Sequence, residues 1–170
     1  MLEVMTDRLD AAALRQAFGC FPSGVIAVCA TVDGVPVGMA ASSFTGVSLD
    51  PPLVSVCIQH TSTTWPRLRN RPYLGVSVLA EGHDETCISL SRKEGDRFAG
   101  VAWTELPGGG VVVHGSTARL NCRLRDEVPA GDHLIALLEI CSLQAHPETS
   151  PLIFHGSRFR RLATHTPTER

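Results

Sequence analysis

The stretch VIAVCATVDGVPVGMAASSFTGVSLDPPLVSVCI, residues 25–58, decides the fold because it predicts one strand after another, joined by tight turns. Residues 25–31 are rich in β-branched side chains, and Asp33-Gly34 is a hairpin signal that leads into a second strand over 35–44. Residues 45–49 continue extended, and two prolines then force a bend before an apolar strand over 53–58. A β-meander is therefore expected here.

The flanking sequence adds further strands and a few short helices. Apolar residues at helical spacing predict a helix over 9–19. Further strands are expected over 73–79, 111–124, 133–146, 152–155 and 158–162, and short helices over 65–71 and 85–91. A mainly β protein with so many strands favours a closed antiparallel barrel with helical caps, since closure removes exposed strand edges.

Composition limits the domain organisation and the partners. The 170 residues favour one domain, over 1–163, followed by a flexible polar tail over 164–170. A net charge of -2 and a pI near 6.4 argue against a nucleic-acid surface. No apolar run approaches the roughly 20 residues that span a bilayer, and the N-terminus lacks a signal pattern. We expect a cytoplasmic protein without a membrane partner.

The cysteines and histidines predict neither a disulfide framework nor a metal centre. Six dispersed cysteines without a CxxC pair are expected to be buried thiols. His83, Glu85 and Cys87 lie close together, but their spacing matches no standard metal site.

The second predicted strand has an unusually small centre, formed by Ala40, Ala41, Ser42 and Ser43. Small side chains let a ligand approach the backbone, whose N–H groups can then bind polar atoms. Tight packing in a barrel would require the same residue types, so both interpretations stay open at this point.

A second candidate site is the hydroxyl-rich run from Gln59 to Thr64, which precedes a short predicted helix. Such a run caps a helix or binds an anion such as phosphate. Arg97 is the best cationic candidate for that phosphate, with Arg92 and Lys93 behind it. The alternative for Arg97 is a surface ion pair to Asp96 or Glu94.

Five separated motifs occur in order along the chain: FPSGV (21–25), PVGMAASSF (36–44), VSLDPPLV (47–54), GDRF (95–98) and GDH (131–133). Together they closely resemble the flavin reductase family of the FMN-binding split barrels. The resemblance implies a homodimeric, Greek-key-like antiparallel split barrel with short capping helices. It also implies an NAD(P)H:flavin oxidoreductase that uses NADH or NADPH to reduce FMN or FAD, and that supplies reduced flavin to a partner monooxygenase.

The resemblance assigns site residues as well. His133, in the GDH motif, is expected beside the flavin where the nicotinamide arrives, and is our catalytic candidate. The residues expected to bind the flavin are Ser23, Gly24, Ala40, Ala41, Ser42, Ser43, Ser48, Leu49, Gln59, Ser62, Thr63 and Arg97. Hydride passes directly between stacked rings, so no carboxylate pair or nucleophilic triad is expected.

Four positions depart from the pattern of many relatives. Phe159 replaces an aromatic hydroxyl, Asn121 replaces an acid, and Ala136 and Leu138 replace residues common after the GDH motif. These changes leave open a second hypothesis, a flavin-binding barrel without reductase turnover. A third hypothesis is an amine oxidase of the pyridoxamine-phosphate type. The chain has no GxGxxG turn after a strand, so a nicotinamide nucleotide would bind without a Rossmann phosphate loop.

Overall fold

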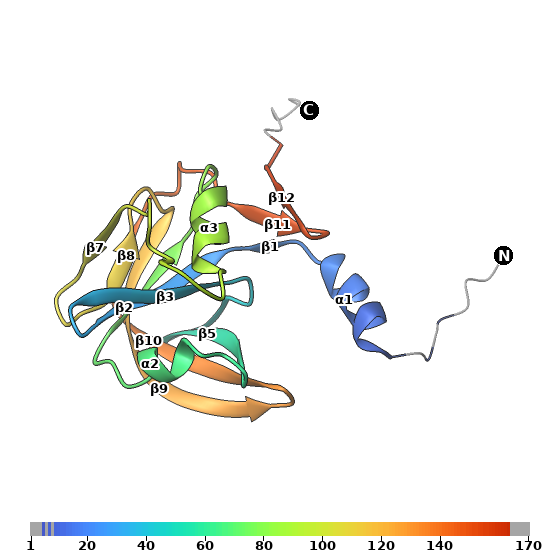
Figure 1. The fold of residues 1–170 in the computed structure, drawn as a ribbon, viewed down its shortest axis with the longest axis horizontal. Coiled ribbons are helices and arrows are strands. Elements are labelled where there is room, and N and C mark those ends of the chain that lie inside the picture. Colours follow the sequence, from blue (N-terminus) through green and yellow to red (C-terminus); the bar gives the residue numbers. More distant parts are fainter. Residues whose placement is uncertain (1–4, 6, 8, 164–170) are drawn as a thin grey trace.

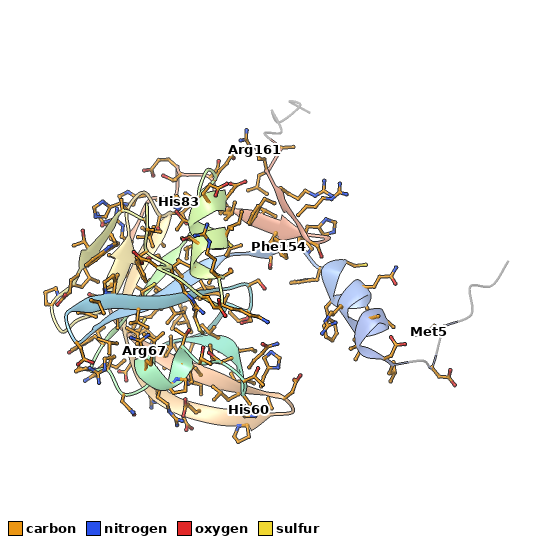
Figure 2. All side chains as sticks on the ribbon, viewed as in Figure 1. Met5, His60, Arg67, His83, Phe154 and Arg161 are labelled. Atoms are coloured by element: carbon orange, nitrogen blue, oxygen red, sulfur yellow. The ribbon has the colours of Figure 1, made fainter. Side chains whose placement is uncertain are left out.

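The computed structural model describes residues 5, 7 and 9–163, so the tail predicted over 164–170 lies outside the described residues. Helix α1 (Ala11–Gly19) begins after Asp10, whose carboxylate caps it by accepting a hydrogen bond of 2.9 Å from the N–H of Ala13. Figure 1 shows α1 standing away from the strands, and its side chains project into open space (Figure 2). The predicted helix is confirmed, but none of its residues is buried.

Seven strands form the main sheet: β2 (Ile26–Val32), β3 (Val35–Ala41), β4 (Thr45–Leu49), β5 (Pro52–Gln59), β6 (Leu74–Val78), β9 (Ala118–Ala130) and β10 (His133–Ala145). Their order in space is β3-β2-β6-β9-β10-β5-β4, and every neighbouring pair is antiparallel. The hairpin predicted at Asp33-Gly34 joins β2 to β3, and both turn residues adopt a positive φ, 51° and 80°. The predicted hairpin is confirmed, but the predicted meander is wrong, because β3 and β4 follow each other in the chain and lie at opposite edges of the sheet.

Smaller elements surround this sheet. Strands β1 (Ser23–Gly24), β11 (Ile153–His155) and β12 (Arg158–Arg160) form a second sheet, and β7 (Trp103–Glu105) pairs with β8 (Val111–Val113) in a third. The remaining helices are α2 (Trp65–Leu68) and α3 (Asp84–Leu90). The terminal hairpin and both short helices are confirmed, whereas β1 and β7 were not predicted.

The single strand predicted over 111–124 is wrong, because the chain turns within it. β8 ends at Val113, and the hydroxyl of Ser116 donates a hydrogen bond of 3.0 Å to the Val113 carbonyl. Between them Gly115 adopts a φ of 73°, a conformation that glycine tolerates best. The chain then enters β9, which runs beyond the predicted end to Ala130.

Strand β2 is buried on both faces and separates two core clusters. Alternate residues of a strand point to opposite faces, so Val28 joins one cluster and Cys29 the other. The first cluster includes Trp65 and Leu68 of α2, and the second includes Leu90 of α3. Burial of these side chains therefore fixes both short helices against the sheet.

Hydrogen bonding does not close the main sheet, so the prediction of a closed barrel is wrong in this respect. β3 and β4 are its two edges. Where β3 ends, a side chain takes the place of a backbone ladder: the Ser43 hydroxyl accepts from the Cys57 N–H at 2.9 Å and donates to the Cys57 carbonyl at 3.2 Å. The barrel stays split beside residues 40–43, as the family resemblance implies.

All six cysteines are free thiols. The expectation that they are buried holds for Cys29 and Cys122, but is wrong for Cys20, Cys57 and Cys141, which are exposed. Among the helices of the described residues, none has the length and apolar character needed to cross a membrane.

Candidate functional site

A cavity of about 710 Å³ lies at the split of the barrel. The end of β3, the end of β5 and the start of β10 contribute to it, together with the hydroxyl-rich loop and the segment that follows α3. Nine residues predicted from the sequence line this cavity: Ala40, Ala41, Ser42, Ser43, Gln59, Ser62, Thr63, Arg97 and His133. The fold therefore gathers residues that are up to 93 positions apart in the sequence.

The pairing of β5 with β10 explains part of this convergence. His133, the first residue of β10, pairs with Gln59, the last residue of β5. The N–H of His60 then donates to the carbonyl of Asp132 at 3.0 Å, which continues the contact beyond the strands. The GDH motif and the start of the hydroxyl-rich loop are thus held side by side.

Four predicted residues lie outside the cavity. Ser23 and Gly24 form β1, where they pair with Phe154 and Ile153 of β11. Ser48 and Leu49 lie on the edge strand β4, and Leu49 is 97% exposed. Their assignment to the flavin stays a prediction that the cavity of this chain does not support.

The small residues at the end of β3 leave room for a flat ring. Ala40 and Ala41 pair with Ala27 and Ile26 of β2, so their backbone is rigid before any ligand arrives. Ser42 is exposed, whereas the Ser43 hydroxyl is already bonded to the backbone of Cys57. Of the two serines, Ser42 therefore has the freer hydroxyl for a ligand.

The hydroxyl-rich loop combines the two roles that its sequence left open. The Ser62 hydroxyl accepts a hydrogen bond of 3.1 Å from the N–H of Trp65, which caps the start of α2. Thr63 is exposed to the cavity, and Thr64 is buried with its hydroxyl against Arg97. The hydroxyl of Ser62 is thus engaged at the start of α2, whereas the hydroxyl of Thr63 is available to bind an anion.

Arg97 is held in place by neutral oxygens. Its Nη1 donates to the Thr64 hydroxyl at 2.8 Å and to the Gly38 carbonyl at 3.1 Å. The alternative of an ion pair with Asp96 or Glu94 finds no support in the described part of the chain, and Asp96 instead accepts from the N–H of Phe98 at 2.9 Å. The half-buried guanidinium thus keeps its positive charge for a phosphate.

His133 is oriented by the residue before it. Its Nδ1 lies 2.6 Å from Oδ1 of the exposed Asp132, which leaves Nε2 as the other polar atom of the ring. The hydrogen bond from His133, together with its charge, lowers the pKa of the Asp132 carboxyl. The ring of a half-buried histidine is thereby fixed at the rim of the cavity.

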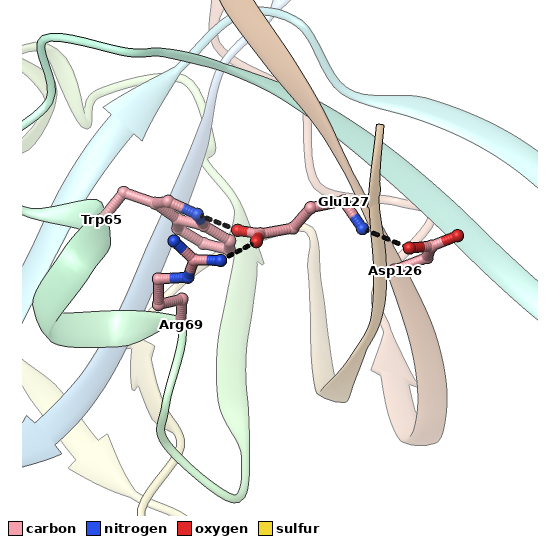
Figure 3. Close-up of polar contacts among 4 residues, drawn as sticks. All are labelled: Trp65, Arg69, Asp126 and Glu127. Atoms are coloured by element: carbon pink, nitrogen blue, oxygen red, sulfur yellow. Dashed lines mark hydrogen bonds and ion pairs between the residues drawn. The ribbon is translucent and has the colours of Figure 1, made fainter. Parts of the chain in front are cut away.

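The sequence analysis missed a carboxylate that supports the site. Glu127 on β9 accepts hydrogen bonds from the indole of Trp65 and the guanidinium of Arg69, both at α2 (Figure 3). It also missed Met39, Cys57, Ile58, Leu90, Ser91 and Glu94 as residues that line the cavity, and within the hydroxyl-rich run it did not single out Thr61 or Thr64. Met39, Ile58, Thr61 and Thr64 directly adjoin a predicted residue, so proximity was the signal that could have found them, whereas Cys57, Leu90, Ser91 and Glu94 carry no such signal.

The four departures from the family pattern lie away from this cavity. The ring of Phe159 packs edge-on against Phe154 with 5.7 Å between centroids. Ala136 and Leu138 are 0% exposed in the core, and Asn121 donates from Nδ2 to the Pro107 carbonyl at 3.4 Å. None of these four residues lines the 710 Å³ cavity.

The residues present fit a bound flavin. A cavity of this volume accepts a three-ring plate and its chain. Its small strand end allows close approach to backbone donors, and Thr63, Arg97 and Lys93 supply a hydroxyl and positive charge for a phosphate. The geometry therefore suits an anionic, flat, elongated ligand.

Comparison with known proteins agrees with this geometry. Residues 18–163 match the family described as "Flavin reductase like domain". The reductase subunit HsaB of a flavin-dependent monooxygenase from Rhodococcus jostii is 36% identical over 156 residues, which cover 92% of this chain and 80% of the relative. An NADH-dependent FAD reductase from Streptomyces globisporus is 38% identical over 165 residues, 94% of this chain and 90% of the relative.

Solved structures give the same result. The NADH:FAD oxidoreductase SgcE6 of Streptomyces globisporus, in complex with NAD and FAD fragments, superposes with a TM-score of 0.89 at 34% identity. The match covers 99% of this chain and all of that one. The overall arrangement, split barrel included, is therefore shared with these proteins.

Proposed function

Because the chain belongs to the flavin reductase-like family, we propose that it is an NAD(P)H:flavin oxidoreductase, which reduces FMN or FAD with NADH or NADPH. The observation that carries this proposal is the single cavity in which the small end of β3, the hydroxyl-rich loop, Arg97 and His133 meet. No catalytic acid or base is required of these residues, because a hydride transfers directly between correctly stacked rings.

The bound flavin supplies the ring that accepts the hydride, and the protein positions it. Ala40 and Ala41 bring rigid backbone against the edge of the ring, where fixed N–H donors favour negative charge. Thr63 and Arg97 hold the phosphate end. His133, fixed by Asp132, orients the nicotinamide from the rim.

Rapid mixing under anaerobic conditions tests the proposal. The protein with FMN or FAD is mixed with NADH or, separately, with NADPH, and the flavin absorbance band is followed. Rapid bleaching that depends on the protein is expected. Bleaching no faster than in the protein-free control would contradict reductase activity and would favour the flavin-binding alternative without turnover.

That alternative rested on the four departures from the family pattern. Phe159 packs against Phe154, and Ala136 and Leu138 are buried in the core, so these side chains stabilise the fold and do not contact a ligand in the cavity. None of them borders the cavity that would bring flavin and nicotinamide together. The position of these residues therefore favours the reductase over a carrier.

NADH and FAD are the pair we expect this protein to prefer. An NADH-dependent FAD reductase is 38% identical to it, and another relative is named as the reductase subunit of a flavin-dependent monooxygenase. We accordingly expect a monooxygenase to receive the reduced flavin. Three exposed free thiols suit the reducing cytoplasm, where we expect the reaction to occur.

A homodimer is expected as well, and α1 supports it. None of its nine residues is buried, Phe18 is 71% exposed, and Phe21, two residues beyond the helix, is 78% exposed. A helix this short is marginal in water on its own, so its apolar side chains need a partner surface. Sedimentation should show a dimer at micromolar concentration, and Phe18→Ser should weaken it. A wild-type monomer would contradict this expectation.

A further inference from the structure

A second cavity of about 540 Å³ adjoins the flavin cavity. The two cavities share five lining residues, Thr63, Thr64, Lys93, Glu94 and Arg97. The second one extends away from that shared wall toward the start of β3 and toward Trp103. Two chambers therefore lie in series, with Arg97 and the two threonines between them.

The position of the second cavity indicates which part of an elongated flavin it could bind. The ring end of a flavin belongs at residues 40–43 and His133, and its phosphate belongs at Thr63 and Arg97. FMN ends at that phosphate, whereas FAD continues into a second phosphate, a ribose and an adenine. The second cavity begins where FMN would end, an argument that rests on the proposed function.

The lining of the second cavity suits this continuation. Val35 and Trp103 offer apolar and aromatic surface for a flat base. Arg67 at α2 and Lys93 supply positive charge, and neither forms an ion pair within the described residues. Glu94 also lines the cavity, and its carboxylate can accept hydrogen bonds from ribose hydroxyls.

Arg67 is the residue that separates the two flavins. It is exposed and lines the second cavity, but it does not line the first. Its N–H donates to the Thr64 carbonyl at 3.0 Å, so its backbone is fixed beside the shared wall. We infer that the second cavity binds the adenylate half of FAD, and that Arg67 pairs with the phosphate that FMN lacks.

Calorimetric titration of the flavin-free protein with FMN and with FAD tests this inference without any turnover. In Arg67→Ala the dissociation constant for FAD should rise about tenfold, while the constant for FMN stays unchanged. Val35→Asp, which places a negative charge on the exposed apolar wall of the second cavity, should produce the same selective loss. AMP, which carries only the phosphate that FMN lacks, should bind the wild-type protein and compete with FAD but not with FMN.

Arg158→Ala is the matched control, because Arg158 is an exposed arginine on β12 that lines neither cavity. It should change neither constant. An equal loss for both flavins in Arg67→Ala would place this residue at the shared phosphate and overturn the inference. An unchanged FAD constant in both variants would overturn it too. Failure of the proposed function would appear separately, as wild-type protein that binds flavin but oxidises neither nucleotide.

Discussion

Trp65 and Glu127 lie 62 residues apart in the sequence and meet in a hydrogen bond of 2.5 Å between the indole N–H and one carboxylate oxygen. The indole is 3% exposed and the glutamate side chain 16%. The other carboxylate oxygen accepts from Arg69 (Figure 3). One carboxylate on β9 thus fixes α2, and with it the hydroxyl-rich loop, against the hairpin that leads to His133.

Removing this carboxylate should destabilise the protein and weaken flavin binding together. Glu127→Ala leaves a buried indole N–H without its acceptor, which costs about 1–3 kcal/mol. Glu127→Gln keeps an oxygen for Trp65 and loses only the charge opposite Arg69, so a smaller loss is expected. Urea unfolding and FMN titration of both variants measure the two effects.

Glu139 provides the control for that experiment. It lies on the neighbouring strand β10, and its ion pairs with Arg123 and Arg125 are long, 4.0 and 3.9 Å. Exposed pairs of this kind contribute about 0–1 kcal/mol, so Glu139→Ala should be nearly neutral. Equal losses in the Glu127 and Glu139 variants would contradict a specific role for Glu127.

Arg97 should determine affinity for both flavins, because it lies at the wall that the two cavities share. A charge-assisted hydrogen bond contributes about 1.5–3 kcal/mol, so Arg97→Ala should weaken FMN binding roughly 10- to 100-fold. Fluorescence titration measures this change. Unchanged FMN affinity would remove Arg97 from the phosphate site. Thermal unfolding of the flavin-free variant checks that its fold is retained.

Local signals in the sequence predicted the hairpins, but not the order of the strands. The positive φ at Asp33 and Gly34 is a property of those residue types, so the β2–β3 turn is encoded locally. That β6 lies between β2 and β9 depends on long-range pairing, which no short window contains. The turn at Gly115 escaped detection although Gly115 and Ser116 are turn-forming residues, because the apolar run over 111–113 and the alternating sequence over 118–124 were joined into one predicted strand.

The same distinction applies to the site. Of the nine cavity residues found from the sequence, six belong to motifs and three, Gln59, Ser62 and Thr63, to the hydroxyl-rich run. Glu127, in contrast, acts through contacts with α2. Its neighbours in sequence give no hint of that contact. Thr64 was passed over as one hydroxyl among four, and only the structure shows that it holds Arg97.

Close packing at Gly75 predicts a strong effect of a single methyl group. A Cβ on Gly75 would lie 2.0 Å from the carbonyl oxygen of Val111, and backbone cannot yield as a flexible side chain can. Gly75→Ala should therefore lower the free energy of unfolding by about 3 kcal/mol or prevent folding. Gly46→Ala, where a Cβ meets nothing within 4 Å, is the matched control. Similar stability of the two variants would contradict the packing argument.

His133→Ala should separate flavin binding from reduction. The imidazole is fixed by Asp132 at the rim, so its loss should raise the KM for NADH or lower turnover while the FMN dissociation constant changes little. His146→Ala provides the comparison, since His146 also faces a carboxylate, 3.7 Å from Glu148, but lies outside the cavity. Unchanged steady-state kinetics at saturating flavin would return His133 to a structural role.

Thiol labelling reports on the cavity without any reaction. Cys57 is exposed and lines the flavin cavity, whereas Cys20 and Cys141 are exposed elsewhere. Iodoacetamide should modify all three at pH 8, and bound FMN should slow modification of Cys57 alone. Site-resolved mass spectrometry distinguishes them. Equal protection of the three thiols, or none at Cys57, would contradict flavin binding in this cavity.

The buried thiols extend the experiment to pH. Burial raises the pKa of Cys29 and Cys122 to about 12, from an ordinary value of 9.0, because the thiolate is poorly solvated there. Both should stay unmodified at pH 8 until the protein unfolds. The folded state favours the protonated thiols, so their contribution to stability is intact below pH 9 and lost as the pH rises toward 12. Urea midpoints that hold constant from pH 8 to 11 would contradict this linkage.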